Sequence, residues 1–550
     1  MAHPTQIPNV VFPSRVDEIA RETPDRPWFS LPIDDNELSK GWRDVSFAQG
    51  ARAVNRFCEF LEPRIGRSDG SNVVANVTAR IDPAPILVCL ALLKLGHVGL
   101  WSAPRNTEAM HLNLFERTNS NVLLHTKEIP PKAVTGDREM QTFQLPSLAD
   151  VLDESGPEPK SYPYTKTYDE IKDMPLAIIH TSGSTGMPKP RYLSTEWCNI
   201  GTSQGFVPPV DGRATIPSVI MGHHRSYIGV PPWHSAGLLM AGLGATIIGK
   251  LIYVCGPALI PPFGDTARQV LKYANVEQTL ANPIIVMDMS RSEEDLKLLG
   301  TQKWVMFGGG SVDKASGDRV SKYVTLQTFI ASTECYCQGL QLMNGPEERD
   351  LWDYFHFSPE HKGVEFHEQS PGNYEQVIVR NPENEINAIF SMFPDISEYR
   401  TSDLFERHPD PSKSGFYKYV GRTDDLIAFA NAAKYSPLAY EEHIMGNKLV
   451  RAAVMVGIQR PCAALLIELV DPEMSSEEAL EEIWPTVEEA NAAAPKHALV
   501  RKEMLIIGKK AKPFERASKE TVIRGRTLNM YKEEIDAVYS IYGENWQLKN

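Results

Sequence analysis

A run rich in glycine and hydroxyl residues, Thr181-Ser-Gly-Ser-Thr-Gly-Met-Pro-Lys189, follows directly after the apolar segment 176–179. Gly183 and Gly186 allow the backbone to turn tightly, so that several N–H groups converge on one point. Lys189 adds a positive charge. Further donors are the hydroxyl groups of Thr181, Ser182, Ser184 and Thr185. The run predicts a polyphosphate-binding loop without the Gly-Lys-Ser/Thr ending of the Walker motif, and its position after a buried strand disfavours a mere surface turn.

The run closely resembles the phosphate-loop motif of the acyl-adenylating superfamily, which includes acyl-CoA synthetases, the adenylation domains of nonribosomal peptide synthetases and luciferases. Six more segments resemble motifs of that superfamily and occur in the same order. These segments are 231–237, 307–310, 331–334, 399–403, 421–425 and 513–524. The resemblance covers nearly the whole chain, and it implies that ATP activates a carboxylic acid to an acyl-adenylate.

Two of these segments are implied to border the substrate. Pro231-Pro-Trp-His-Ser-Ala-Gly237 resembles the aromatic–histidine motif beside the acyl pocket, and its histidine is also assigned to catalysis. Phe307-Gly-Gly-Gly310 resembles the strand end whose backbone lies against the adenine, which assigns Gly309 and Gly310 to the nucleotide. Considered alone, a histidine beside a tryptophan would be a packed core residue, and three glycines only a loop. The pocket residues implied by the resemblance are Trp233, His234, Gly237, Gly308, Gly309 and Ser332.

The segment Ala331-Ser-Thr-Glu334 resembles the superfamily's Gly-x-Thr-Glu motif. The resemblance implies that Glu334 binds the Mg²⁺ that accompanies ATP. It also implies that Thr333 contacts the adenylate phosphate in catalysis, with Ser332 beside it at the nucleotide. Mg²⁺ prefers oxygen ligands and usually combines one or two carboxylates with substrate phosphates. Residues 330–331 are Ile-Ala instead of the usual Tyr-Gly, so we expect the adenine to lose an aromatic partner.

Two further segments are implied to hold the rest of the nucleotide. Tyr399-Arg-Thr-Ser-Asp403 resembles the motif whose aspartate, Asp403 here, accepts hydrogen bonds from the ribose hydroxyls. In Gly421-Arg-Thr-Asp-Asp425, the resemblance implies that Arg422 also reaches the nucleotide. Each segment alone could be a surface ion-pair cluster, but their order and spacing with the other motifs disfavour that interpretation.

The first aspartate of 421–425, Asp424, is implied to be a hinge, a single position that absorbs a large dihedral change. Beyond it the pattern becomes α+β, with a helix expected over 474–493 and a strand over 503–507. We therefore expect residues 1–423 to form a large adenylation core and residues 424–550 a small mobile domain, which is an ordinary domain size.

The last segment, Pro513-Phe-Glu-Arg-Ala-Ser-Lys-Glu-Thr-Val-Ile-Arg524, resembles the motif that carries the catalytic lysine. The resemblance assigns Lys519 to bridge the substrate carboxylate and the α-phosphate. Less favoured lysines nearby are Lys509, Lys510 and Lys512. Where relatives have a glycine beside the thiol channel, this chain has Ala432, whose methyl group is expected to narrow the path of a phosphopantetheine arm.

The stretch Trp233-His-Ser-Ala lacks the aspartate with which amino-acid-activating relatives hold the α-amine. We therefore expect an aryl or other non-amino carboxylic acid as the substrate. With its ending Tyr531-Lys-Glu-Glu-Ile-Asp, the chain resembles the adenylation part of fungal carboxylic acid reductases. That resemblance implies a carrier domain bearing phosphopantetheine and an NADPH-dependent reductase domain. Neither has a signature after residue 525, which predicts either an excised domain or a stand-alone ligase.

Two alternatives stay open. A stand-alone acyl- or aryl-CoA ligase would differ only in its thiol acceptor. A degenerate protein that binds the nucleotide without turnover is favoured by the substitutions at positions 330, 331 and 432.

The elements that must position these residues are predicted to form layers. Apolar, β-leaning runs alternate with helical patterns, as is typical of buried strands covered by helices. Strands are expected at 121–125, 176–180, 251–254, 304–307 and 376–379. The predicted fold is α/β, with a large N-terminal body of several subdomains, layered sheets and helices, and a small mobile α+β C-terminal domain.

Composition excludes several classes of protein. A chain of 550 residues is too long for one compact core, and its net charge of −14 disfavours nucleic acid as a partner. Seven scattered cysteines are typical of reduced core thiols in a cytoplasmic protein. The apolar segment 235–255 is interrupted by Lys250 and predicts a buried helix entering a strand, so no membrane partner is expected.

Overall fold

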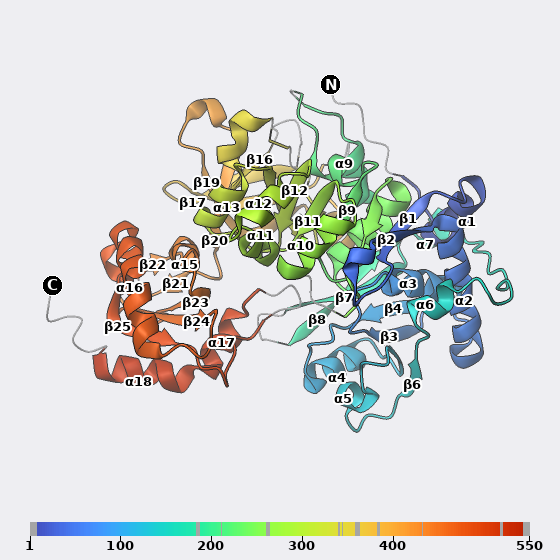
Figure 1. Ribbon diagram of the computed structural model, residues 1–550, viewed down its shortest axis with the longest axis horizontal. Helices are drawn as coiled ribbons and strands as arrows, with labels where there is room; N and C mark the ends of the chain where they lie inside the picture. The colour runs from blue at the N-terminus through green and yellow to red at the C-terminus, as the bar shows by residue number, and fades with distance from the viewer. Residues whose placement is uncertain are drawn as a thin grey trace.

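The computed structural model describes residues 8–182, 187–210, 212–259, 264–338, 342–343, 345–357, 363–381, 385–431, 433–516 and 521–542. Figure 1 shows a large body that runs from blue through yellow to light orange along the chain, with a darker orange-to-red domain beside it. The predicted α/β architecture with a separate C-terminal domain is confirmed.

The first sheet of the large body has seven strands in the order β13-β12-β11-β9-β10-β1-β2. Neighbouring strands are parallel except β1 and β2, which form an antiparallel pair at one edge. The strands are β1 (Pro27–Pro32), β2 (Trp42–Ser46), β9 (Arg225–Ile228), β10 (Ile252–Val254), β11 (Gln278–Ala281), β12 (Trp304–Gly308) and β13 (Thr325–Phe329). The strands expected at 251–254 and 304–307 are β10 and β12.

The second sheet has six strands in the order β6-β5-β3-β4-β7-β8. It is parallel except for the last pair, β7 and β8, which form an antiparallel hairpin. The strands are β3 (Val73–Val77), β4 (Val98–Trp101), β5 (Val122–His125), β6 (Gln141–Gln144), β7 (Pro175–Ser182) and β8 (Pro188–Ser194). The strands expected at 121–125 and 176–180 are β5 and β7.

The third sheet is antiparallel, with five strands in the order β16-β20-β19-β18-β17. The strands are β16 (Tyr354–His356), β17 (Val364–Ser370), β18 (Asn373–Val379), β19 (Glu398–Arg407) and β20 (Phe416–Arg422). Two short strands, β14 (Ala331–Ser332) and β15 (Tyr336–Cys337), form a separate antiparallel ribbon. The strand expected at 376–379 is β18.

Helices cover these sheets, and several begin with side-chain caps. At the start of α2, Ser46 Oγ accepts from the Gln49 N–H at 3.3 Å, while Gln49 Oε1 accepts from the Ser46 N–H at 3.0 Å. The α-helices of the body are α1 (Phe12–Glu22), α2 (Phe47–Ile65), α3 (Ala84–Lys94), α4 (Glu108–Arg117), α5 (Pro131–Thr135), α6 (Leu148–Leu152), α7 (Tyr168–Ile171), α8 (Thr195–Ser203), α9 (Ile216–Ile220), α10 (Gly264–Tyr273), α11 (Pro283–Met289), α12 (Glu293–Leu299), α13 (Lys314–Val320) and α14 (Ile389–Met392). Short 3₁₀ turns are Leu38–Lys40, Gln204–Phe206, Pro346–Leu351 and Pro411–Lys413.

The segment Ala236–Ile248 is a π-helix, which was not predicted in that form. Its wide turn is seen where the Gly249 N–H donates to the Gly244 carbonyl, five residues earlier, at 3.1 Å. Gly242 lies against α3, where an added Cβ would come within 2.6 Å of the Ile86 side chain. π-Helical turns are usually short and often occur at functional sites. As predicted, the apolar segment is a buried helix that is followed by the strand β10.

Helix α3 belongs to the largest core cluster, which contains residues of both the first and the second sheet. Its residues 85–92 are all buried, which explains why it is apolar on every side. At its last turn, the buried Lys94 places Nζ 2.7 Å from Asp17 Oδ1 on α1. A buried charge needs such a partner, so this ion pair fixes α1 on α3.

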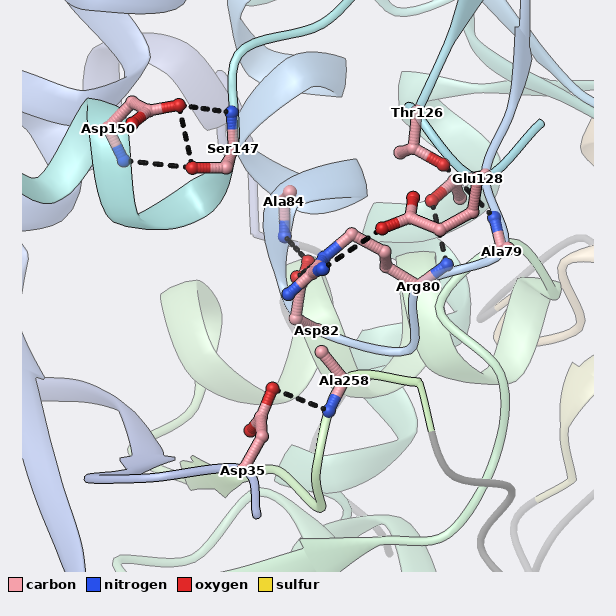
Figure 2. Close-up of polar contacts among 11 residues, drawn as sticks. Asp35, Ala79, Arg80, Asp82, Ala84, Thr126, Glu128, Ser147, Asp150 and Ala258 are labelled. Atoms are coloured by element: carbon pink, nitrogen blue, oxygen red, sulfur yellow. Dashed lines mark hydrogen bonds and ion pairs between the residues drawn. The ribbon is translucent and has the colours of Figure 1, made fainter. Parts of the chain in front are cut away.

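A charged cluster joins the loops that follow β3 and β5. Arg80 donates from Nε to Asp82 Oδ2 at 2.7 Å and from a terminal nitrogen to Glu128 Oε1 at 3.4 Å, as Figure 2 shows. The next N–H, of Ile81, donates to the Ala258 carbonyl at 2.8 Å. Because Ala258 follows β10, this bond fixes the second sheet against the first.

The C-terminal domain has a core of its own, whose buried members all lie within 427–539. Its elements are β21 (Ile427–Ala428), β22 (Lys434–Tyr435), α15 (Leu438–Met445), β23 (Val450–Val456), β24 (Ala463–Leu469), α16 (Ser476–Ala493), a 3₁₀ turn (Lys496–Ala498), β25 (Val500–Ile507), α17 (Arg524–Met530) and α18 (Lys532–Tyr542). The helix expected at 474–493 and the strand expected at 503–507 are α16 and β25. The boundary at 423/424 and the mobility of this domain stay predictions.

All seven cysteines lie in the described part of the chain, where each is buried and none forms a disulfide. This agrees with the predicted core thiols, and burial raises the pKa of Cys89 to about 12. Across the described ranges, no helix is both long enough and apolar enough to cross a membrane.

Candidate functional site

The predicted phosphate loop connects β7 to β8. Across this hairpin, Thr181 is the register partner of Lys189, so the predicted positive charge lies at the strand end. Ser182 is described by its backbone alone, as the register partner of Pro188. The other predicted loop residues, Gly183, Ser184, Thr185 and Gly186, lie outside the described residues. The structure therefore gives the two strand ends that flank the loop.

Glu334, the predicted Mg²⁺ ligand, lies beside this hairpin. Its Oε1 accepts a hydrogen bond from Nε of Arg191 on β8 at 2.8 Å, and its backbone carbonyl accepts from the Trp197 indole at 2.9 Å. Arg191 was not among the residues predicted from the sequence. The available signal was its spacing, because residues two apart on a strand share a face, and Arg191 follows Lys189 at that distance.

Thr333 lies where two of the predicted motifs meet. Its Oγ1 is 3.4 Å from Oγ of Ser235, at the start of the π-helix. In the turn between β14 and β15, Ser332 Oγ accepts from the Cys335 N–H at 2.9 Å, which fixes the turn that presents Thr333. The predicted pocket motif and the predicted Mg²⁺ motif are thus adjacent in space.

The aromatic–histidine motif leads into the π-helix. His234 accepts a hydrogen bond at Nδ1 from the Ala236 N–H at 3.2 Å. Trp233 packs against the largest core cluster, and its indole nitrogen is buried with no hydrogen-bond partner among the described residues. At Gly237 an added Cβ would lie 2.2 Å from the Pro231 carbonyl, so only glycine fits. A buried indole N–H without a partner is available to donate a hydrogen bond to a bound molecule.

The glycine-rich end of β12 is closely packed. A Cβ added at Gly308 would lie 2.8 Å from the Phe329 carbonyl, so the strand end has no room for a side chain. Gly309 has a φ of 85°, in the left-handed region that favours glycine. The aliphatic side chains of Ile330 and Ala331 pack against the largest core cluster.

Two contacts bring the C-terminal domain onto the large body, and one of them is at these glycines. A Cβ added at Gly310 would lie 3.1 Å from Cγ2 of Thr521. Arg526 on α17 is 3.7 Å from the sulfur of Met110 on α4, and Figure 1 shows α17 on the side of the red domain that faces the body. Lys519, the predicted catalytic lysine, lies outside the described residues. Its described neighbour Thr521 nevertheless meets the glycine-rich strand end.

Asp403 and Arg422 face each other on β19 and β20. Their side chains form an ion pair of 2.8 Å, and Nε of Arg422 also donates to Asp424 Oδ1 at 2.8 Å. Ser402, where relatives have glycine, has a φ of 64° in the left-handed region. Its N–H donates to Glu375 Oε1 at 3.3 Å, a contact that was not predicted from the sequence. This bond supports a turn that serine adopts less readily than glycine.

Glu442 on α15 lies at the contact between the C-terminal domain and the large body. It faces Ser311 and Asp313, which follow β12, as well as Asp353 and Lys418 of the body. Burial raises the pKa of Glu442 to about 7. The hydrogen bond with Ser311 and the charge of Lys418 oppose this rise, whereas Asp353 and Asp313 add to it.

We expect the contact between the two domains to weaken as the pH rises. A released C-terminal domain would return Glu442 to its ordinary pKa of 4.5, against about 7 in the contact. The contact therefore gains stability that is complete below about pH 4.5 and lost as the pH rises through about 7. Energy transfer between fluorophores on the two domains, measured from about pH 5 to about pH 8, checks this. Glu442→Gln should remove the pH dependence, and a profile unchanged by that substitution would contradict the prediction.

The family model described as AMP-binding enzyme matches residues 16–353. The chain belongs to the AMP-binding enzyme family. A second family model, described as the C-terminal domain of AMP-binding enzymes, matches residues 424–542. The family resemblance that was inferred from the motifs is confirmed.

Several curated relatives of this AMP-binding enzyme are fungal reductases. A carboxylic acid reductase of Neurospora crassa is 32% identical over 95% of this chain and 50% of its own length. The adenylate-forming reductase Nps9 of Serpula lacrymans is 28% identical over 93% of this chain and 48% of its own length. The chain therefore spans about half the length of these relatives. It is an adenylate-forming, acyl-activating enzyme domain, as predicted.

A solved structure shows that the whole fold is shared. The O-succinylbenzoate coenzyme A synthetase of Bacillus subtilis, in complex with ATP and magnesium ion, matches 94% of this chain and 99% of its own chain, with a TM-score of 0.64. The two sequences are only 16% identical, so the likeness concerns the fold.

Proposed function

We propose that this AMP-binding enzyme uses ATP and Mg²⁺ to convert a carboxylic acid to an acyl-adenylate, and then passes the acyl group to a phosphopantetheine thiol on a carrier domain. The observation that carries the proposal is the ion pair between Arg191 and Glu334. It places the carboxylate expected to bind Mg²⁺ beside the strand that leaves the predicted phosphate loop. Residues 1–423 would form the adenylation core, and 424–550 the domain that carries the lysine.

In the first step, a carboxylate oxygen of the acid forms a bond to the α-phosphorus of ATP, and the bond to the leaving pyrophosphate breaks. The protein contributes mainly positioning and charge stabilisation to such a reaction. Lys189 and the loop from 181 to 186 would hold the phosphates. Lys519 would contact both the α-phosphate and the acid, while the Thr333 hydroxyl group would contact the adenylate phosphate and His234 would border the reacting groups.

Mg²⁺ would offset charge on the polyphosphate when it is bound. Among the described residues, no group of three His, Cys, Asp or Glu side chains is placed to hold a metal ion. A site built from Glu334 and ATP phosphates needs only one protein carboxylate, because Mg²⁺ commonly takes one or two carboxylates and substrate phosphates. The Glu334 side chain is 13% exposed and is held by Arg191, so its carboxylate is oriented before the nucleotide binds.

The remaining nucleotide contacts would come from the third sheet and from β12. Asp403, already oriented by Arg422, would accept hydrogen bonds from the ribose hydroxyls. The backbone of Gly309 and Gly310 would lie against the adenine, with Ser332 at its edge. Ile330 supplies an aliphatic surface where relatives supply an aromatic ring, so stacking would contribute less to nucleotide affinity.

The proposed substrate is an aryl or other non-amino acid. The motif 231–237 contains no carboxylate that could hold an α-amine. The unpaired indole nitrogen of Trp233 would donate a hydrogen bond to the acid, in a pocket that also includes Gly237 and Gly308. An acid whose ring carries a hydrogen-bond acceptor would satisfy that donor.

The reductase names of the relatives, and the half-length match to them, favour a carrier domain and an NADPH-dependent reductase domain as partners in a longer protein. After adenylation, the C-terminal domain would rotate about Asp424, whose side chain is 64% exposed. A CoA ligase is the alternative. Ala432, beside the expected thiol path, lies outside the described residues, so the choice between the two thiols is left to experiment.

ATP–pyrophosphate exchange across a panel of carboxylic acids tests the proposal. Exchange with at least one aryl or aliphatic acid, and none with α-amino acids, is the expected result. Binding of ATP without exchange for any acid would instead support the degenerate nucleotide-binding alternative. Thioester formation, measured with CoA and with a phosphopantetheinylated carrier, then distinguishes a CoA ligase from the adenylation domain of a carboxylic acid reductase.

A further inference from the structure

On the side of β7 that faces β4, main-chain pairing stops before the strand ends. β4 and β7 pair in parallel at Leu100 and Ile178, and β7 continues beyond the end of β4. There a side chain takes the place of main-chain pairing, because Nε2 of His180 accepts a hydrogen bond from the Ala103 N–H at 3.1 Å. This imidazole therefore ties the strand end that enters the phosphate loop to the segment after β4.

A short network extends this contact to α4. Asn106 Nδ2 lies 3.2 Å from Nε2 of His180 and donates to Ser102 Oγ at 3.0 Å. Ser102 Oγ in turn is 2.8 Å from Nδ1 of His111, a buried residue of α4. The position of His180 is thus determined by groups on two neighbouring elements.

The hydrogen bonding also determines the protonation state of His180. A backbone N–H can only donate, so Nε2 is unprotonated and the imidazole proton lies on Nδ1. Burial lowers the pKa of His180 to about 4, which keeps the ring neutral near pH 7. A protonated ring would direct a donor toward the Ala103 N–H and break the contact.

The other strand of the hairpin is tied to the same helix. Asn113 on α4 donates from Nδ2 to the Pro188 carbonyl at 2.8 Å. Pro188 is the first residue of β8 and the register partner of Ser182. Helix α4 and the segment before it therefore hold both strand ends that flank the predicted loop.

We propose that His180 is a positioning residue for the phosphates of ATP, acting as a hydrogen-bond acceptor that fixes the strand end from which the phosphate loop begins. The inference rests on the proposed function, since it assumes that this loop binds ATP. The preceding residues 176–179 of β7 are apolar and buried, and the packing of the partly buried position 180 would be satisfied by an apolar side chain as well. The hydrogen-bond acceptor Nε2 is what distinguishes histidine from an apolar side chain at this position.

His180→Phe tests this role, because it keeps a ring and removes the acceptor from the Ala103 N–H. Without the acceptor, the strand end shifts in the free protein so that the Ala103 N–H can reach water, and returning it to its place when ATP binds costs free energy equivalent to roughly tenfold in affinity. We expect the KM for ATP in pyrophosphate exchange to rise by roughly tenfold, with a change of less than about twofold in the KM for the acid. His180→Gln places an acceptor oxygen at a similar reach and should restore most of the ATP affinity.

His97→Phe is the matched control. His97 is a buried histidine directly before β4, and its ring nitrogens lie 3.0 Å from the Gly66 carbonyl and 3.3 Å from Asn72 Nδ2. Burial lowers its pKa, as it does for His180. The substitution should cost thermal stability without raising the KM for ATP, because these partners lie outside the hairpin.

Calorimetric measurement of ATP binding distinguishes a failure of the proposed function from a failure of the positioning role of His180. If ATP binds to the wild type and pyrophosphate exchange is absent, the proposed function fails, while weaker ATP binding by His180→Phe would still support the positioning role. Unchanged ATP affinity in His180→Phe, or an equal loss in His97→Phe, would overturn the inference alone. A wild type that binds no ATP would overturn both.

Discussion

The Glu334→Gln variant is expected to catalyse ATP–pyrophosphate exchange roughly 100-fold more slowly than the wild type. The amide keeps the shape of the side chain but loses the negative charge with which Glu334 would hold Mg²⁺. The Mg²⁺ concentration that gives half-maximal exchange should rise as well. Exchange at saturating acid over a series of Mg²⁺ concentrations, together with Mg²⁺-dependent ATP binding by calorimetry, measures both effects.

The substitution also breaks an ion pair, so the control must do the same elsewhere. Glu334 is 13% exposed and 2.8 Å from Arg191, whereas Glu348 is 18% exposed and has an oxygen 2.7 Å from a terminal nitrogen of Arg213. Glu348→Gln should therefore lower thermal stability to a similar degree and leave exchange unchanged. Equal losses of exchange in the two variants would show that Glu334 acts through folding rather than through Mg²⁺.

The strands of the parallel sheets could be predicted because their chemistry is local. Segment 176–179 is apolar at every position since β7 is buried on both faces, and that pattern needs no knowledge of its neighbours. β17 (Val364–Ser370) was not predicted, because most of its residues are polar and none is buried. The π-helical turn of Ala236–Ile248 also left no signal, since a segment that is apolar on every side shows no period.

The motifs located the site, but the contacts within it depend on pairs that are distant in sequence. Arg191 and Glu334 are 143 residues apart, and His180 and Ala103 are 77 residues apart. The type of one residue does not identify its partner in the sequence, because charge and hydrogen-bonding capacity do not determine which residues meet until the sheets are assembled. Resemblance could assign Glu334 a role, whereas only the fold shows what orients its carboxylate.

Lys519→Ala is expected to lower pyrophosphate exchange by roughly tenfold or more, because a positive charge would be lost from the α-phosphate and the attacking carboxylate. Lys519 lies outside the described residues, but Thr521 lies against Gly310 at the end of β12. That contact supports the assignment, since it brings the segment next to the lysine onto the predicted nucleotide site. Exchange at saturating ATP and acid gives the measurement.

The competing lysines are engaged within the C-terminal domain. Lys509 and Lys512 place their ammonium groups 2.7 and 2.8 Å from Glu534 Oε1, and these hydrogen bonds lower the pKa of Glu534 to about 2. Lys510 pairs with Glu473 on the surface. Lys510→Ala is therefore the matched control, a lysine-to-alanine change in the same domain that should leave exchange within about twofold of the wild type.

Measuring adenylation and thioester formation separately distinguishes a catalytic lysine from a structural one. In the proposed scheme Lys519 acts on the carboxylate and the α-phosphate before the domain rotates about Asp424, so its work is finished once the acyl-adenylate exists. Thioester formation from a supplied acyl-adenylate should then differ from the wild type by less than about threefold in Lys519→Ala. Equal loss of both steps would instead mean that the lysine maintains the domain itself. Unchanged exchange would move the catalytic role to Lys509 or Lys512, which would first have to leave Glu534.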